Sequence, residues 1–201
     1  MIETVGVVGA GIIGRAIAAH AAKGGQRVLL GNRRGPDTLA DLAESLGPAV
    51  TAVTAKEAAT AELVVLAIPF TSVPDFGPTV DWSGRIVVDA TNQFASHDPY
   101  EGRADTGGLT GSEFLARHLP GATLVKAFNA MYGARVAADP RHTEGRQVVF
   151  YAGDDDTANT RFAELVGHWG FAPVYVGPLR SGGRLMQLDG HLSGLHILKQ
   201  D

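Results

Sequence analysis

Short apolar runs recur along the chain, separated by segments in which apolar residues follow helical spacing. Eight of these runs predict strands, at residues 4–9, 27–31, 49–53, 62–68, 85–90, 123–128, 147–152 and 172–177. Several are nearly continuous in Val, Leu and Ile, as is typical of strands buried on both faces of a parallel sheet. The alternation predicts an α/β fold with a doubly wound, mostly parallel sheet of about eight strands.

Polar residues and glycines mark where the intervening helices begin and end. Thr54 with Glu57, and Thr110 with Glu113, have the spacing of a capping box, which predicts a helix start after each threonine. The acids at 154–156 are expected to form a turn and a helix cap rather than a metal site. Glycines at three positions predict helix ends: Gly24, Gly47 and Gly170.

Length and composition predict a single domain. The chain has 201 residues, 45% of them hydrophobic and 19% charged, which suits one domain over residues 1–201 with a short helical tail after the last strand. A net charge of −4 gives no general attraction for nucleic acid or an anionic membrane, so we expect a small-molecule partner. With no basic leader and no long apolar run, a cytoplasmic protein is expected, and the lack of cysteine excludes disulfides and cysteine metal sites.

The strongest motif is a glycine pattern, G-x-G-x-x-G, between the first predicted strand and an amphipathic helix. In a Rossmann-type fold the first glycine permits a tight turn, the second lets the backbone approach a pyrophosphate, and the third allows close helix packing. The alternative is a glycine-rich turn without a ligand. The predicted phosphate-binding loop comprises Gly9, Ala10, Gly11, Ile12, Ile13 and Gly14.

The second predicted strand ends at Asn32, where a dinucleotide-binding chain commonly carries an acid that binds the adenosine ribose. An aspartate there would repel a 2′-phosphate, whereas Asn32 followed by Arg33 and Arg34 removes that repulsion and offers two guanidinium groups. This predicts NADP(H) rather than NAD. The alternative is that both arginines are solvated turn residues.

Ligands of open α/β sheets bind outside the carboxyl ends of the strands. The fourth predicted strand ends at Ala67, Ile68 and Pro69, and the fifth is followed by Asn92, so these residues are expected to wall the nicotinamide. Asn92 would bond the ribose or carboxamide, or merely begin a turn. The irregular segment 91–111 is longer than a connection requires, and we expect it to exclude water from the site.

The chain lacks the usual acid–base groups for reducing a carbonyl. It contains no Tyr-x-x-x-Lys sequence, shows no Ser-His-Asp arrangement, and its seven histidines have no metal-ligand spacing, so no metal site is predicted. A flat redox-active ring placed on the nicotinamide would fit, because direct hydride transfer between rings depends chiefly on orientation. Lys126 would touch a phosphate or extend to solvent from a strand end.

Several segments together resemble the NADPH-dependent reductases of the deazaflavin coenzyme F420, the coenzyme F420:NADP oxidoreductase family. These segments include "VGVVGAGIIGRAIA", "GNRR", "AIPF", "VVDATNQF", "LPGATLVKAFNAMYGARV" and the closing "LHI". The resemblance implies NADP(H) as cofactor and F420 as hydride partner. It places the loop that begins at Ala127 over the nicotinamide, with Asn129, Met131 and Tyr132 on the acceptor side.

Two features leave the acceptor open. Archaeal members of the family have a histidine where this chain has Asn129, and the "KAFN" sequence also occurs in membrane ferric reductases. The resemblance predicts a homodimer that transfers a hydride between NADPH and F420. The alternatives are an NADPH-dependent reductase of flavin or ferric complexes, and a non-catalytic NADPH sensor.

Overall fold

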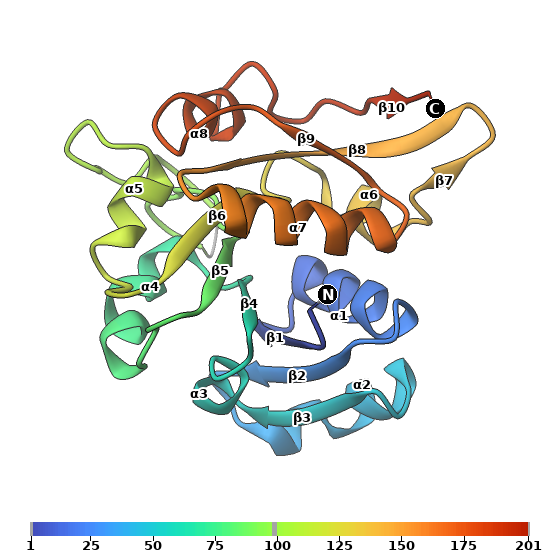
Figure 1. The fold of residues 1–201 in the computed structure, drawn as a ribbon. Coiled ribbons are helices and arrows are strands. Elements are labelled where there is room, and N and C mark those ends of the chain that lie inside the picture. Colours follow the sequence, from blue (N-terminus) through green and yellow to red (C-terminus); the bar gives the residue numbers. More distant parts are fainter. Residues whose placement is uncertain (1, 98–99, 201) are drawn as a thin grey trace.

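The computed structural model describes residues 2–97 and 100–200, whose strands form one ten-stranded sheet with helices on both faces (Figure 1). The strands are β1 (Thr4–Val8), β2 (Arg27–Asn32), β3 (Val50–Thr54), β4 (Leu63–Leu66), β5 (Ile86–Asp89), β6 (Thr123–Ala127), β7 (Arg141–His142), β8 (Gly145–Gly153), β9 (Ala172–Tyr175) and β10 (Leu198–Lys199). The helices are α1 (Ile12–Lys23), α2 (Ala40–Leu46), α3 (Ala55–Ala58), α4 (Val73–Phe76), α5 (Gly111–Ala116), α6 (Gly133–Ala137), α7 (Asp156–His168) and α8 (Ser181–Met186). Short 3₁₀ turns lie at Pro36–Leu39, Phe70–Ser72 and Gly77–Thr79.

The sheet has the strand order β10-β8-β6-β5-β4-β1-β2-β3, with β7 and β9 also paired to β8. Strands β1 to β6 are parallel, β8 is antiparallel to β6, and β9 is parallel to β8. The predicted α/β class is confirmed, and all eight predicted strands are present. Strands β7 and β10 were not predicted, because two residues each are too few to give a periodic signal.

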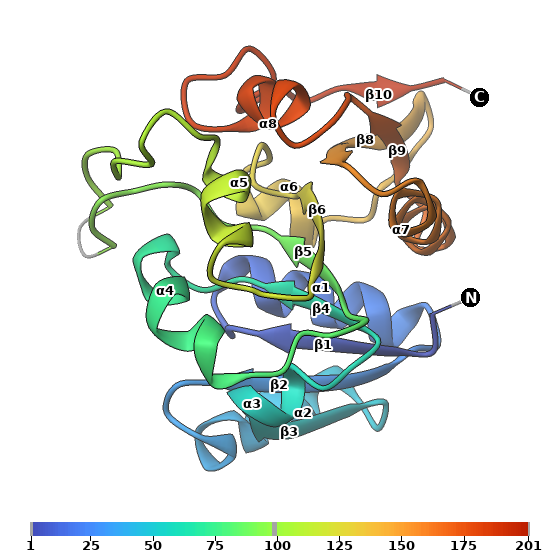
Figure 2. The ribbon, with the colours of Figure 1, turned by 60° about the vertical axis from the view of Figure 1, so that its left-hand side comes forward.

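Alternate residues of the central strands enter two different cores. Leu63 and Val65 face the core beneath α1, α2, α6 and α7, whereas Val64 and Leu66 face the core beneath α3, α4 and α5. Figure 2 shows α4 and α5 on the opposite side of the sheet from α7. Burial on both faces explains why these strands are apolar throughout.

The predicted helix caps are present. Thr54 and Thr110 each form a capping box with the glutamate three residues later, and Asp155 caps α7 by accepting a bond of 2.7 Å from Ala158 N. After β9 the chain forms α8 and then β10, which adds an edge strand beyond the expected helical tail. Within the described ranges, no helix is both long and apolar enough to cross a membrane.

Candidate functional site

The three motif glycines meet three different constraints. Gly9 has a φ of +109°, and an added Cβ would lie 2.2 Å from Ala67 O. At Gly14 an added Cβ would lie 1.9 Å from Gly9 O, so α1 packs closely against the loop. Gly11 is different, because an added Cβ would meet no atom within 4 Å. Its backbone therefore borders open space, as a loop that receives a phosphate requires.

That open space is a cleft of about 980 Å³ at the carboxyl ends of β1 to β4. The strand order reverses between β1 and β4, where ligands of such sheets bind. The size suits a dinucleotide-sized ligand. The predicted residues that line the cleft are Gly9, Ala10, Gly11, Asn32, Arg33, Arg34, Ala67, Ile68 and Pro69.

At the end of β2, the Asn32 side chain shapes a turn. Its Oδ1 accepts a bond of 2.8 Å from Arg34 N, and its Nδ2 donates to Thr38 Oγ1 at 3.0 Å. In the part of the chain that the structure describes, the guanidinium groups of Arg33 and Arg34 have no ion pair or hydrogen bond. Asn32 thus orders the turn, while two unpaired cations are left beside the cleft.

Lys56 lies beside the same cleft and was missed by the sequence analysis. Strands β2 and β3 are parallel, with Asn32 opposite Thr54, so α3 begins next to the β2 turn. The ends of β2 and β3 pack closely, because an added Cβ on Gly31 would lie 2.7 Å from Thr54 O. The capping box at Thr54 predicts that Lys56 lies in the first turn of the next helix. If the ends of the second and third predicted strands are taken as neighbours, that turn lies beside the β2 turn, so Lys56 could have been identified from the sequence. Other lining residues that were missed are Ser72, Asp75, Phe76, Thr79, His97 and Tyr100.

At the ends of β5 and β6 the structure brings Asn92 and Asn129 together. Asn92 Nδ2 donates to Asn129 O at 3.1 Å, and Asn129 Nδ2 donates to Asn92 Oδ1 at 3.2 Å and to Met186 O at 2.8 Å. Phe128, just before Asn129, has a φ of +65°, a strained conformation for a residue other than glycine. Asn129 is only 6% exposed, so its side chain orders the loop from within.

Asn92, Asn129 and the remaining predicted residues lie outside the cleft lining. Ala127 is buried in the core, and Ile13 and Met131 pack partly buried against it. Ile12 and Tyr132 are each 71% exposed. Gly133, the residue after Tyr132, packs against Ile12, because an added Cβ there would lie 2.4 Å from Ile12 Cγ2, and the Tyr132 ring lies beside Gly194. We call Ile12 and Tyr132 the apolar shelf; it adjoins the start of α1, next to the phosphate loop.

The Lys126 side chain takes neither of the two positions expected for it, at a phosphate or in solvent. Its side chain is 5% exposed and forms a buried ion pair with Asp89, 3.1 Å from Nζ to Oδ2, instead of reaching a phosphate or solvent. Lysine can take this inward position because the partner carboxylate lies on the neighbouring strand β5. Elsewhere, residues 2–97 and 100–200 contain no group of three or more His, Asp or Glu side chains that could hold a metal.

A doubly wound sheet, a glycine loop at the amino end of α1 and a cleft at the switch point define a Rossmann-type nucleotide-dependent oxidoreductase. Residues 4–93 match the family described as NADP oxidoreductase, coenzyme F420-dependent. The matched region, somewhat under half of the chain, contains the glycine loop and the β2 turn, and it supports NADP(H) as the cofactor. The open backbone at Gly11 and the unpaired Arg33 and Arg34 fit the phosphates of that cofactor.

Three relatives extend the comparison along the chain. A hypothetical protein of Sinorhizobium meliloti is 38% identical, with a TM-score of 0.91 over 100% of this chain and 97% of its own. A protein of Arthrobacter sp. FB24 assigned as an F420-dependent NADP-reductase is 25% identical, with a TM-score of 0.73 over 89% of this chain and 86% of its own. The rat metalloreductase STEAP3 is 29% identical over 88% of this chain, which spans only 34% of that protein.

Proposed function

We propose that this protein transfers a hydride between NADPH and the deazaflavin coenzyme F420. The observation that carries the proposal is the apolar shelf, two exposed side chains beside the loop that borders the nucleotide cleft. An exposed aromatic and an exposed aliphatic side chain offer a flat acceptor ring a surface next to the cofactor. The family description and the assignment of the Arthrobacter protein support the same acceptor.

On the nucleotide side, the free cations at the β2 turn bind the 2′-phosphate of NADPH. Arg33 and Arg34 offer planar guanidinium groups, and Lys56 adds a third positive charge from the start of α3. Gly11 presents its backbone to the pyrophosphate, where α1 contributes amide donors and the positive end of its dipole. These groups fix one end of the cofactor, so that its other end is directed toward β5 and β6.

On the acceptor side, orientation is the main contribution of the chain. Bound NADPH supplies the hydride. The mutual bonds of Asn92 and Asn129 hold the ends of β5 and β6 in register, while Tyr132 contacts the acceptor ring from the shelf. Met131, between Asn129 and Tyr132, packs partly buried against the core and supports this loop. Hydride transfer between ring carbons needs no protein acid or base at the reacting atoms.

A second candidate function is the reduction of ferric complexes or flavins with NADPH. The similarity to metalloreductase STEAP3 favours it, since the match covers 88% of this chain. The apolar shelf would then receive a flavin ring. Absorbance assays with NADPH and one acceptor at a time, namely oxidised F420, FMN or a ferric chelate, distinguish the two functions. Rapid loss of oxidised F420 with slow reduction of the others supports the first, and the reverse order supports the second.

A further inference from the structure

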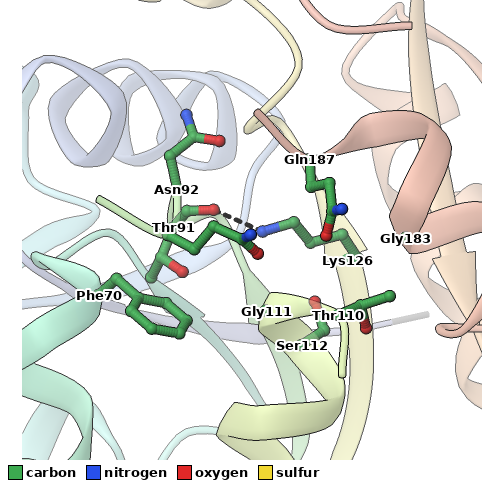
Figure 3. Close-up of a pocket in the computed structure, with 10 residues that line it drawn as sticks. Phe70, Thr91, Asn92, Thr110, Gly111, Ser112, Lys126, Gly183 and Gln187 are labelled. Atoms are coloured by element: carbon green, nitrogen blue, oxygen red, sulfur yellow. Dashed lines mark hydrogen bonds between the residues drawn. The ribbon is translucent and has the colours of Figure 1, made fainter. Parts of the chain in front are cut away.

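A buried polar cluster lies at the ends of β5 and β6, and Figure 3 shows three of its members, Thr91, Ser112 and Lys126. The carboxylate of Asp89 accepts bonds from Thr91 N at 2.9 Å, Thr91 Oγ1 at 2.7 Å, Ser112 Oγ at 2.6 Å and Lys126 Nζ at 3.1 Å. Both oxygens of the fully buried Asp89 side chain are therefore satisfied. Burial lowers the pKa of the Lys126 ammonium, and the facing carboxylate opposes that shift. A buried charge pair with this many partners fixes its surroundings in one arrangement.

Lys126 has a second partner that points toward the functional site. Its Nζ donates to the backbone carbonyl of Thr91, the bond drawn as a dashed line in Figure 3. Thr91 is thus held through its amide, its hydroxyl and its carbonyl. The next residue is Asn92, whose side chain pairs with Asn129. The position of Asn92 therefore depends on a lysine that the proposed mechanism does not otherwise use.

The remaining side of the lysine faces a cavity too small for any ring. The cavity has a volume of about 10 Å³, which accommodates about one water molecule. Gln93 and Gln187 line it, and the Oε1 atom of each is buried without a hydrogen-bond partner among the described residues. Neither nicotinamide nor a deazaflavin could reach Lys126 here. The lysine can act on the reaction only through the residues that it holds.

The same contacts connect the cluster to α8. Asn129 Nδ2 donates to the carbonyl of Met186, the last residue of α8, and the following residue, Gln187, lines the cavity beside Lys126. Three segments far apart in the sequence, at the ends of β5, β6 and α8, therefore meet around one ammonium group. Loss of that group would release the Thr91 carbonyl, and with it the segment that carries Asn92 to its pairing with Asn129.

We propose that Lys126 is a positioning residue for hydride transfer: through the Thr91 carbonyl it fixes Asn92 and the Asn92–Asn129 pair against the reacting rings. This inference rests on the proposed placement of the nicotinamide at the ends of β5 and β6. It predicts that removing the lysine impairs transfer without weakening the binding of the cofactor, whose phosphates are held on the other side of the sheet's switch point.

The test uses the double variant Asp89→Asn/Lys126→Met. The asparagine can still accept from Thr91 and donate to Ser112, so no unpaired buried charge remains, while the ion pair and the bond to the Thr91 carbonyl are both lost. We expect NADPH affinity within about threefold of wild type and a single-turnover rate lower by roughly tenfold to a hundredfold. The matched control is Lys23→Met, at a lysine 73% exposed on α1, which should leave both quantities unchanged.

A second measurement needs neither a variant nor turnover. In ¹⁵N-lysine-labelled wild-type protein, saturation with NADP⁺ should shift the NMR signal of the buried Lys126 ammonium, because the cofactor contacts the residues that Lys126 holds. An unshifted signal would overturn the proposal, as would a folded double variant that transfers hydride at the wild-type rate. If F420 is not reduced at all while NADP⁺ shifts the signal, the proposed acceptor fails and the positioning role stands.

Discussion

Asn92 and Asn129 exchange hydrogen bonds across the ends of two parallel strands, at 3.1 and 3.2 Å, although 37 residues separate them in the sequence. Asn129 Oδ1 is buried without a partner in the described residues, and Asn92 is only partly buried. The pair therefore ties the loop after β6 to the loop after β5 and leaves the Asn92 side chain more exposed than that of Asn129.

The variant Asn129→Ala should slow hydride transfer more than it weakens NADPH binding. It removes the bonds to Asn92 and Met186, and a displacement of about 1 Å at a reacting ring can lower a rate on the order of a hundredfold. Single-turnover transfer at saturating NADPH gives the rate, and a fluorescence titration gives the affinity. An equal loss in both quantities would assign Asn129 to cofactor binding or folding.

The three unpaired basic side chains at the nucleotide cleft, those of Arg33, Arg34 and Lys56, should determine the preference for NADPH over NADH. We expect NADPH to bind more tightly than NADH by about 2 kcal/mol, roughly thirtyfold. Replacing Arg33 and Arg34 by alanine should remove most of this preference, and Lys56→Met should remove part of it, with NADH affinity nearly unchanged. Calorimetric titrations with both nucleotides at one salt concentration test this. Equal wild-type affinities would contradict it.

Substitution by valine should impair different properties at two glycines of the motif: cofactor binding at Gly11 and fold stability at Gly14. Gly11→Val places its side chain in open space, so the protein should fold but lose NADPH binding. Gly14→Val places Cβ about 1.9 Å from Gly9 O and should destabilise the fold itself. Thermal unfolding combined with NADPH titration separates the two effects. Normal NADPH binding by the Gly11 variant would show that the pyrophosphate lies elsewhere.

His20 should make stability depend on pH. The ring is buried between α1 and α6, with Nε2 2.7 Å from Val136 O, and burial lowers its pKa from 6.5. Above pH 6.5 the histidine is neutral in both states and its contribution is fully present. As pH falls from 6.5 toward the native pKa, the unfolded state takes up the proton first, so the free energy of unfolding decreases.

The measurement for His20 is urea unfolding of wild type and His20→Gln on both sides of pH 6.5. Glutamine can still donate to Val136 O but does not titrate, so the wild type should lose more stability on acidification than the variant. The same loss in both proteins would assign the pH dependence to other groups.

The sequence predicted the features that depend on local patterns. Continuous apolar runs identified the central strands, and Thr54 and Thr110 identified two helix starts. The glycine motif located the cleft, because its spacing reflects one continuous segment. Strand β10 was missed because its two residues are ordered by pairing with β8, a contact that leaves no local signal.

Predictions for the proposed acceptor side, at the ends of β5 and β6, were less complete because that side is assembled from segments far apart in the sequence. The inward position of Lys126 follows from Asp89 on a neighbouring strand, which no spacing in the sequence indicates. Asn129 was expected to face the acceptor, and only the bonds to Asn92 and Met186 reveal that its amide is already engaged. Lys56 could have been found by aligning the ends of β2 and β3.

The central claim is direct hydride transfer from NADPH to F420, and a single-turnover experiment with NADPH deuterated at the transferred position tests it most directly. The protein is mixed with deuterated NADPH and oxidised F420, absorbance follows the loss of oxidised F420, and mass spectrometry analyses the product. The account predicts rapid reduction and one deuterium on the carbon of the deazaflavin ring. Reduction no faster than without protein, or a product without deuterium, would contradict it.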